Sequence, residues 1–378
     1  MQTYHSYNAR ENQWPRIGNM EGADYTLCRN NETQRGKIMK ECVKRFVLVA
    51  SMICFASVLA MPVLAAELEF KLRFSHLMPA PHKVAILYDG WAKEVDKRTN
   101  GRVKVVVFPG ATLTPAAQTY DSLSRGVIDV AMGILSYTPG RTPLSEVICL
   151  PVGLKTGSQA TRMADAFFKK FQPKELSDVK IFYLMGCPPI MFHTKVPVNK
   201  IDDLKGLRIK GDPNTLKIVS AAGASPTTIP LAETYDSVKR GLAEGIFLPV
   251  ETLKGWKFGE VVKYTYENSA SNCTGSFYFA MNKDKWNALP KDIQQVIEKI
   301  NEEWFEKQAK LWDEIDSEAR DFLANSGHKF VKATPEDEAK MRQRMQPILE
   351  KYVSDMKAKG LPGAEALKFC VDFVKAHP

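Results

Sequence analysis

The chain has 378 residues, 44% of them hydrophobic and 25% charged, and a formal net charge of +9. This length suffices for two lobes that each have their own core. The excess of 52 Lys and Arg residues over 43 Asp and Glu residues is spread along the chain without a basic stripe, so nucleic-acid binding is not expected. A general attraction for anionic solutes is compatible with this charge.

Residues 1–66 are interpreted as a leader with a cleaved signal peptide. Basic residues precede an apolar run at 46–60, which has the length of a signal-peptide core, and the small residues Ala65 and Ala66 offer a cleavage site. A membrane anchor is the alternative, but the apolar stretch contains a proline and only just reaches spanning length. The sequence leaves open whether translation starts at Met1 or at Met39.

Four cysteines follow the leader, at positions 149, 187, 273 and 370. In an oxidising compartment they allow one disulfide or buried free thiols, and their spacing selects neither. The chain has no CxxC motif and no clustered His and Cys residues, so we expect neither a metal nor a cofactor.

The first elements after the leader alternate between strand and helix. Strands are predicted at 68–75, 103–108 and 127–133 from alternating or continuous apolar residues, and amphipathic helices at 83–99 and 115–125. This succession predicts a lobe built of strand-helix-strand units.

A second α/β layout occupies residues 197–245. Residues 207–210 form a short strand that ends at a Gly-Asp-Pro turn, and an extended segment at 227–229 precedes a helix at 232–243. Strand, helix, strand and helix imply a parallel sheet, whose ligands bind at the carboxyl ends of the strands. We recognise no internal repeat.

Two helices are predicted in the last third of the chain. Residues 290–324 form one long helix whose apolar stripe indicates a buried face, with Pro290 near its start. Residues 335–359 form a charged helix, interpreted as a solvated face over the second lobe.

Several motifs, in order, resemble one family. DLKGLRIK and GASPTTIPLAETYDSVKRGLAEG are similar to the solute-binding subunit of tripartite ATP-independent periplasmic (TRAP) transporters, the DctP family. LRFSHLMPAPH, FPGATL, YDSLSRGVIDVAMG and MNKDKWNALPKDIQQVIEKI extend the resemblance from about Leu68 to the C-terminus.

The resemblance implies an α/β, two-lobed periplasmic-binding-protein fold, in which each lobe is a mixed sheet flanked by helices and a long helix spans both. It places 67–187 plus about 274–313 in lobe I and 188–273 plus about 314–378 in lobe II. It further implies a periplasmic protein, a monomer or weak dimer, that delivers a small organic acid to the small and large membrane subunits of a permease.

The resemblance also indicates how a ligand anion is held. Family members that bind sugar acids or short dicarboxylates carry an arginine on the strand after DLKG, and the matching position here is Lys210. An ammonium neutralises a carboxylate without the bidentate geometry of arginine. Arg208 is predicted on the same strand face, and the sequence leaves open which of the two holds the ligand.

Other expected pocket positions are less polar than in those family members. Apolar residues and one proline occupy positions where those family members commonly have polar side chains: Leu77, Ile134, Pro188, Phe247 and Leu248. The remaining candidate contacts are His76, Tyr137, Phe192 and Trp256. Such a pocket favours an acid with an apolar or aromatic body, such as tryptophan or an indole or aryl acid.

Alternative functions use the same fold. A short polar carboxylate or sulfonate as ligand, and a sensory receptor domain, both stay open. An enzyme is not expected, because the sequence lacks a GxSxG, HExxH, P-loop or GxGxxG motif in a suitable context and no nucleophile has an evident partner.

Overall fold

The computed structural model describes residue 36, residues 39–49, residue 51 and residues 69–377. The chain divides into two compact units, Met1–Glu67 and Leu68–Pro378. The predicted cleavage site and most of the predicted signal-peptide core lie outside the described residues. Among the described residues, no helix is long and apolar enough to cross a membrane.

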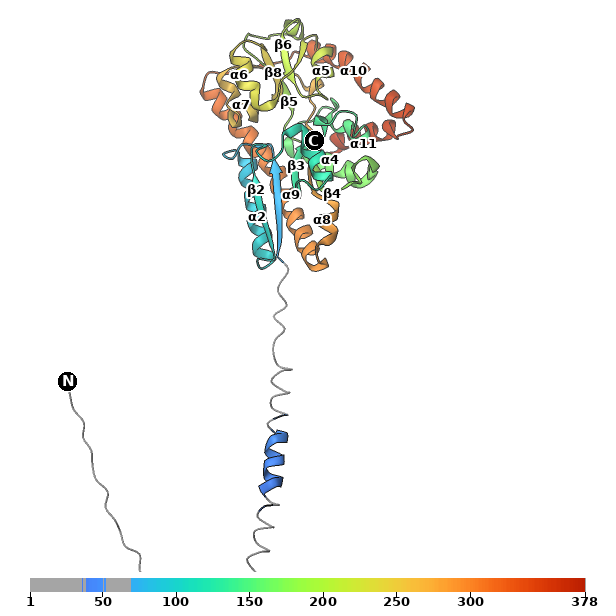
Figure 1. Ribbon diagram of the computed structural model, residues 1–378. Helices are drawn as coiled ribbons and strands as arrows, with labels where there is room; N and C mark the ends of the chain where they lie inside the picture. Colours follow the sequence, from blue (N-terminus) through green and yellow to red (C-terminus); the bar gives the residue numbers. More distant parts are fainter. Residues whose placement is uncertain (1–35, 37–38, 50, 52–68, 378) are drawn as a thin grey trace, which may run out of the picture. The chain divides into compact units, whose positions relative to one another are not determined.

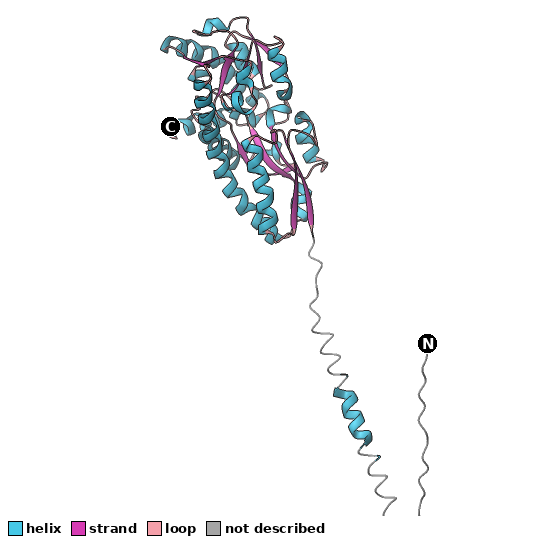
Figure 2. Cartoon of the chain, turned by 90° about the vertical axis from the view of Figure 1, so that its left-hand side faces the viewer, coloured by secondary structure: helices cyan, strands magenta, loops and turns pink. Residues whose placement is uncertain are grey.

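Within residues 69–377 the strands form two sheets, each of which lies in its own part of the molecule (Figure 1). The first sheet has the order β2-β1-β3-β10-β4, and only β10 is antiparallel to its neighbours. Its strands are β1 Phe70–His76, β2 Val103–Phe108, β3 Val130–Ile134, β4 Val179–Met185 and β10 Phe277–Asn282. Helices flank the strands (Figure 2): α2 Lys83–Arg98, α3 Thr119–Ser124, α4 Gly157–Phe171 and α8 Lys283–Ala288. This sheet with these helices is the first lobe.

The second sheet has the order β7-β6-β8-β5-β9-β11. Its strands are β5 Ile190–Thr194, β6 Arg208–Gly211, β7 Ser225–Thr228, β8 Gly245–Pro249, β9 Tyr264–Glu267 and β11 Lys329–Lys332. Together with α5 Leu216–Ala221, α6 Thr234–Lys239 and α7 Glu251–Gly255 it forms the second lobe. Two mixed sheets flanked by helices confirm the predicted fold class.

The two lobes repeat one topology. The order β2-β1-β3-β10-β4 matches β7-β6-β8-β5-β9, and the fourth strand is antiparallel in both. The segments 115–126, PAAQTYDSLSRG, and 230–241, PLAETYDSVKRG, occupy equivalent places and share eight of twelve residues. The expectation that the chain has no repeat is therefore wrong. The repeat is easily missed because this identity is confined to one short segment of each lobe.

The predicted long helix is α9 Lys291–Asn325, which begins directly after Pro290. Its 35 residues span about 52 Å at 1.5 Å per residue. The helix packs against α2 and α4 of the first lobe and against α7 of the second. Its apolar stripe is buried, as predicted, and includes Ile297, Trp304 and Trp312.

The C-terminal helices differ from the prediction of one solvated helix. α10 Pro335–Ala358 buries Met341, Met345, Tyr352 and Met356, because these residues recur every four to seven positions and form one apolar face. A further helix, α11 Gly363–Ala376, was not predicted, and it packs against α10 and α4.

Two of the segments that cross between the lobes lie side by side, one between β4 and β5 and the other between β9 and β10. They are hydrogen-bonded to each other: Cys187 N donates to Thr274 Oγ1 at 2.6 Å, and Ile190 N donates to the Cys273 carbonyl at 3.0 Å. In the described part of the chain Cys149, Cys187, Cys273 and Cys370 are free and buried. Of the two alternatives left by the sequence, the structure has free thiols.

The close approach of β8 to its neighbours predicts a stability difference between two glycines. A Cβ on Gly245 would lie 2.4 Å from the His193 carbonyl oxygen and 2.8 Å from Ile209 Cδ1, whereas one on Gly90 would meet Trp304 Cζ2 at an ordinary 3.6 Å. Gly245→Ala should lower the free energy of unfolding by about 1–3 kcal/mol, measured by urea denaturation.

Gly90→Ala is the matched control, because it removes a helix-interior glycine of α2 and should raise the free energy of unfolding by about 0.5–1 kcal/mol. Equal effects of the two substitutions would contradict the role given to Gly245.

Candidate ligand-binding site

A cavity of about 660 Å³ lies between the two lobes and is called the interlobe cavity here. The first lobe contributes Leu77, Pro79, Gly110, Ala111, Pro115, Ala116, Ala117 and Tyr137. The second lobe contributes Gly211, Asp212, Pro213, Thr228, Ile229, Pro230, Leu231, Ala232 and Trp256. Most of these residues are apolar, and Asp212 is the one charged residue among the described residues that line the cavity.

The position of the interlobe cavity follows from the sheet topology. Some of its lining residues directly follow the carboxyl ends of parallel strands, for example Leu77 after β1 and Asp212 after β6. Open α/β sheets bind ligands at this edge, where loops instead of strands face the solvent. The chain thus brings equivalent edges of its two repeated sheets to one cavity.

Lys210 lies on β6 and is fully buried. Its Nζ donates to Asp212 Oδ1 at 2.6 Å. Thr215 holds the backbone of Asp212, since its Oγ1 accepts from the Asp212 amide at 2.9 Å. The Lys210 ammonium is therefore bound to the Asp212 carboxylate, and of the two side chains Asp212 lines the interlobe cavity.

Tyr137 approaches the same carboxylate from the first lobe. It closes the short helix η2 Leu135–Tyr137 that follows β3. Burial, and then the negative charge of Asp212, raise the pKa of Tyr137 well above its ordinary value. The phenol is therefore neutral, and Tyr137 and Asp212 line the interlobe cavity from opposite lobes.

Arg208 lies at the other end of β6 from Asp212, and its guanidinium forms hydrogen bonds within the second lobe. Its Nε donates to Glu244 Oε2 at 3.0 Å and its Nη2 to the Gly241 carbonyl at 2.9 Å. The first lobe repeats this arrangement, because Arg73 Nε donates to Asp129 Oδ2 at 3.0 Å and its Nη2 to the Gly126 carbonyl at 3.2 Å. Each guanidinium ties a strand of its sheet to a turn of the same lobe, so Arg208 has a structural partner, and it is not one of the described lining residues.

Leu77, Tyr137 and Trp256 are the predicted contacts that line the interlobe cavity. The structure does not bring the other predicted apolar contacts to its lining. Phe192 and Phe247 pack on each other across β5 and β8, with ring centroids 4.3 Å apart. Buried positions are also occupied by Ile134, Pro188 and Leu248.

His76, at the end of β1, is buried against the rings of Phe74 and Tyr88. Burial lowers the pKa of His76 to about 4, so the ring is neutral near neutral pH. It is not among the residues that line the interlobe cavity.

Sequence analysis missed two lining turns, Pro115–Ala117 and Pro230–Ala232. They are the equivalent starts of the repeated segments, and each precedes a short helix of its lobe. The signal that could have found them is the repeat itself, because equivalent turns of two lobes that face each other meet at one cavity.

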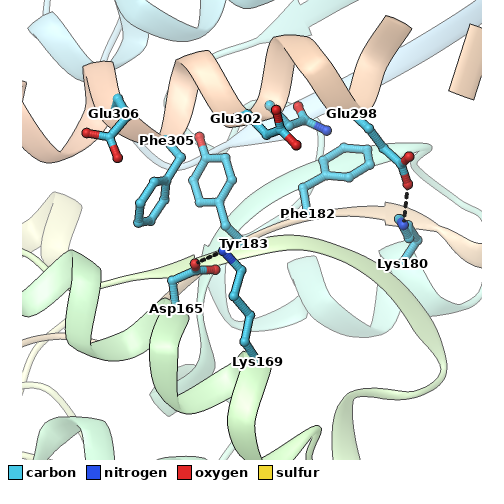
Figure 3. A pocket seen from close by; sticks show the side chains of 10 residues that line it. Asp165, Lys169, Lys180, Phe182, Tyr183, Glu298, Glu302, Phe305 and Glu306 are labelled. Carbon is cyan, nitrogen blue, oxygen red and sulfur yellow. Dashed lines mark hydrogen bonds and ion pairs between the residues drawn. The ribbon is translucent and has the colours of Figure 1, made fainter. Parts of the chain in front are cut away.

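A second hollow, of about 530 Å³, lies in the first lobe between α4, β4 and α9 (Figure 3). Its carboxylates mostly have partners: Asp165 pairs with Lys169 at 2.7 Å and Glu298 with Lys180 at 2.9 Å. None of the described residues that line this hollow belongs to the second sheet or its helices. Movement of the lobes would therefore not enclose a ligand there. The interlobe cavity is therefore the better candidate site.

A buried side-chain contact between His82 and Glu251 joins the lobes beside the interlobe cavity. His82, which caps α2, lies with its Nε2 3.1 Å from Glu251 Oε2 of α7, and the two side chains are 2% and 5% exposed. Glu318 of α9 makes a more exposed link, since it pairs with Lys83 and Lys254 while its own side chain is 41% exposed.

Removing the buried carboxylate should cost more than removing the exposed one. Glu251→Ala leaves His82 buried without its partner and should lower the free energy of unfolding by about 1–3 kcal/mol. Glu318→Ala should cost about 0–1 kcal/mol. Urea denaturation of both variants tests this, and equal losses would show that the buried pair does not hold the lobes together.

These features define a class of protein: two repeated α/β lobes with a largely apolar cavity between them, and, among the described residues, no group of three His, Cys, Asp or Glu side chains placed to hold a metal. The model of the DctP family, bacterial extracellular solute-binding protein family 7, matches residues 74–355. The chain therefore belongs to the DctP family. Family members bind solutes and are not enzymes, which confirms that this chain is not one.

Similar proteins agree with this assignment. The chain is 27% identical over 329 residues to the Outer membrane transporter protein TsaT of Comamonas testosteroni, covering 84% of this chain and 96% of the relative. It is similar to the crystal structure of a TRAP periplasmic solute-binding protein from Desulfovibrio salexigens, with 29% identity, a TM-score of 0.73 and coverage of 82% and 97%. A TRAP protein from Bordetella bronchiseptica with bound (R)- and (S)-mandelate is 27% identical, with a TM-score of 0.75 and coverage of 82% and 99%.

Proposed function

We propose that this chain is the periplasmic subunit of a TRAP transporter, which captures an organic acid with an apolar or aromatic body between its lobes and delivers it to the small and large membrane subunits. The observation that carries the proposal is the interlobe cavity of about 660 Å³, with its mostly apolar lining and the Lys210–Asp212 pair at its wall. The mandelate-bound relative, an aromatic-acid complex of the same fold, supports the proposal.

The energetics of the lining favour an apolar ligand body. An aromatic ring that loses about 150–250 Å² of exposed surface gains roughly 4–6 kcal/mol at about 25 cal/mol per Å², against about 1.5–3 kcal/mol for one hydrogen bond to a charged group. A sugar acid would bury hydroxyl groups against residues such as Leu77, Ile229 and Trp256, and each unpartnered hydroxyl costs about 1–3 kcal/mol.

A thermal-shift screen of the protein purified from the periplasm tests this function. Aromatic and branched aliphatic acids should raise the melting temperature, because they bind the folded state alone, whereas hexuronates and short hydroxylated dicarboxylates should not. Stabilisation by hexuronates alone would overturn the apolar-ligand proposal. It would favour the alternative, a polar carboxylate as ligand.

The two candidate cations should differ in their effect on binding. Lys210→Gln should weaken an aromatic acid by about 2 kcal/mol or more, measured by calorimetry, because it removes a buried charge that can pair with the ligand. Arg208→Gln is the control: it should lower the stability of the second lobe and leave affinity within about twofold, since its guanidinium serves Glu244. The opposite pattern would assign the anion site to Arg208.

A further inference from the structure

The charged group that faces the interlobe cavity is a carboxylate. Asp212 lines the cavity, whereas Lys210 is fully buried and is not one of the described lining residues. The Asp212 side chain is 13% exposed, and its Oδ1 accepts the bond from Lys210 Nζ. A ligand that enters the interlobe cavity therefore meets the negative member of the pair first.

The charge balance of the site discriminates between kinds of acid. Lys210 and Asp212 together carry no net charge, and the other described lining residues carry none. A simple carboxylic acid would add an uncompensated negative charge to a mostly apolar cavity, which is unfavourable. A zwitterion would add no net charge, and its ammonium could lie beside Asp212.

The hydrogen-bonding capacity of the pair allows such a ligand. An ammonium group has three N–H donors, and the bond to Asp212 uses one of the donors of Lys210. A carboxylate accepts at both oxygens. If the Asp212 side chain turns toward the interlobe cavity, it can accept from a ligand ammonium while Lys210 donates to the ligand carboxylate, so that four charges alternate in sign.

We infer that the interlobe cavity selects α-amino acids with an apolar or aromatic side chain, and that Asp212 is the residue that distinguishes them from the corresponding acids without the amino group. This inference rests on the proposed function. Tyr137 lines the same cavity from the first lobe, and its neutral phenol offers a hydrogen-bond donor there. The apolar lining holds the side chain of the ligand.

Calorimetry with matched ligand pairs tests the inference on the protein purified from the periplasm. The pairs are L-phenylalanine with 3-phenylpropionate, L-tryptophan with indole-3-propionate, and L-leucine with 4-methylpentanoate. In at least one pair the amino acid should bind at least about tenfold more tightly than its partner, the effect of one hydrogen bond between charged groups.

Asp212→Asn should abolish this preference. It should weaken the amino acid by about tenfold or more and leave the simple acid bound at least as tightly as before, because Lys210 is then free to pair with its carboxylate. Asp202→Asn is the matched control, since Asp202 pairs with Arg344 at 2.6 Å on an exposed part of the chain and should change neither affinity.

The outcomes separate the inference from the proposed function. Tighter binding of the simple acids, equal binding within each pair, or equal weakening of both members by Asp212→Asn would overturn the inference and leave the proposed function standing. Failure of every acid, with or without an amino group, to bind would overturn both. The comparison of ligands on the unmodified protein remains decisive even if the Asp212 variant does not fold.

Discussion

The position of the interlobe cavity depends on where the parallel strands of the two sheets end. In each lobe a guanidinium, Arg73 of β1 or Arg208 of β6, binds a carboxylate and the carbonyl of a glycine in the turn before the neighbouring parallel strand. Because these contacts are the same in both lobes, the two sheets present equivalent edges. The loops after those edges line one cavity, and the positions of Leu77, Asp212 and Trp256 follow from this arrangement.

Much of the fold could be predicted from the sequence, because hydrophobic periodicity and turn residues are local signals. The stripe of α9 and the strand-helix alternation before residue 133 gave correct elements. The amphipathic character of α10 was not recognised, since its many charged residues mask methionines at helical spacing. The internal repeat escaped notice because its similarity is tertiary, except in one short segment.

The candidate site was less accessible to sequence reasoning. A residue within a strand can point into the core, whereas a residue just after the strand can line the cavity. The sequence places a strand end only to within one or two residues, so it does not decide between these two positions. Tyr137 ends the short helix after β3, Trp256 directly follows the helix α7, and both line the interlobe cavity, whereas Phe192 and Phe247 lie within strands and pack together. The pairing of Lys210 with Asp212, two residues apart, depends on where β6 ends, at Gly211, and the sequence does not fix that end to the residue.

The pair of crossing segments has a mechanical consequence. Two chain passages that are hydrogen-bonded side by side, through Cys187 with Thr274 and Ile190 with Cys273, form a narrow ribbon. The long helix α9, which contacts both halves, is a further link between them. Adjacent chain passages between two compact halves are the arrangement in which domains close about a hinge. The side-by-side crossings therefore favour rotation of one half against the other about the place where the two passages meet.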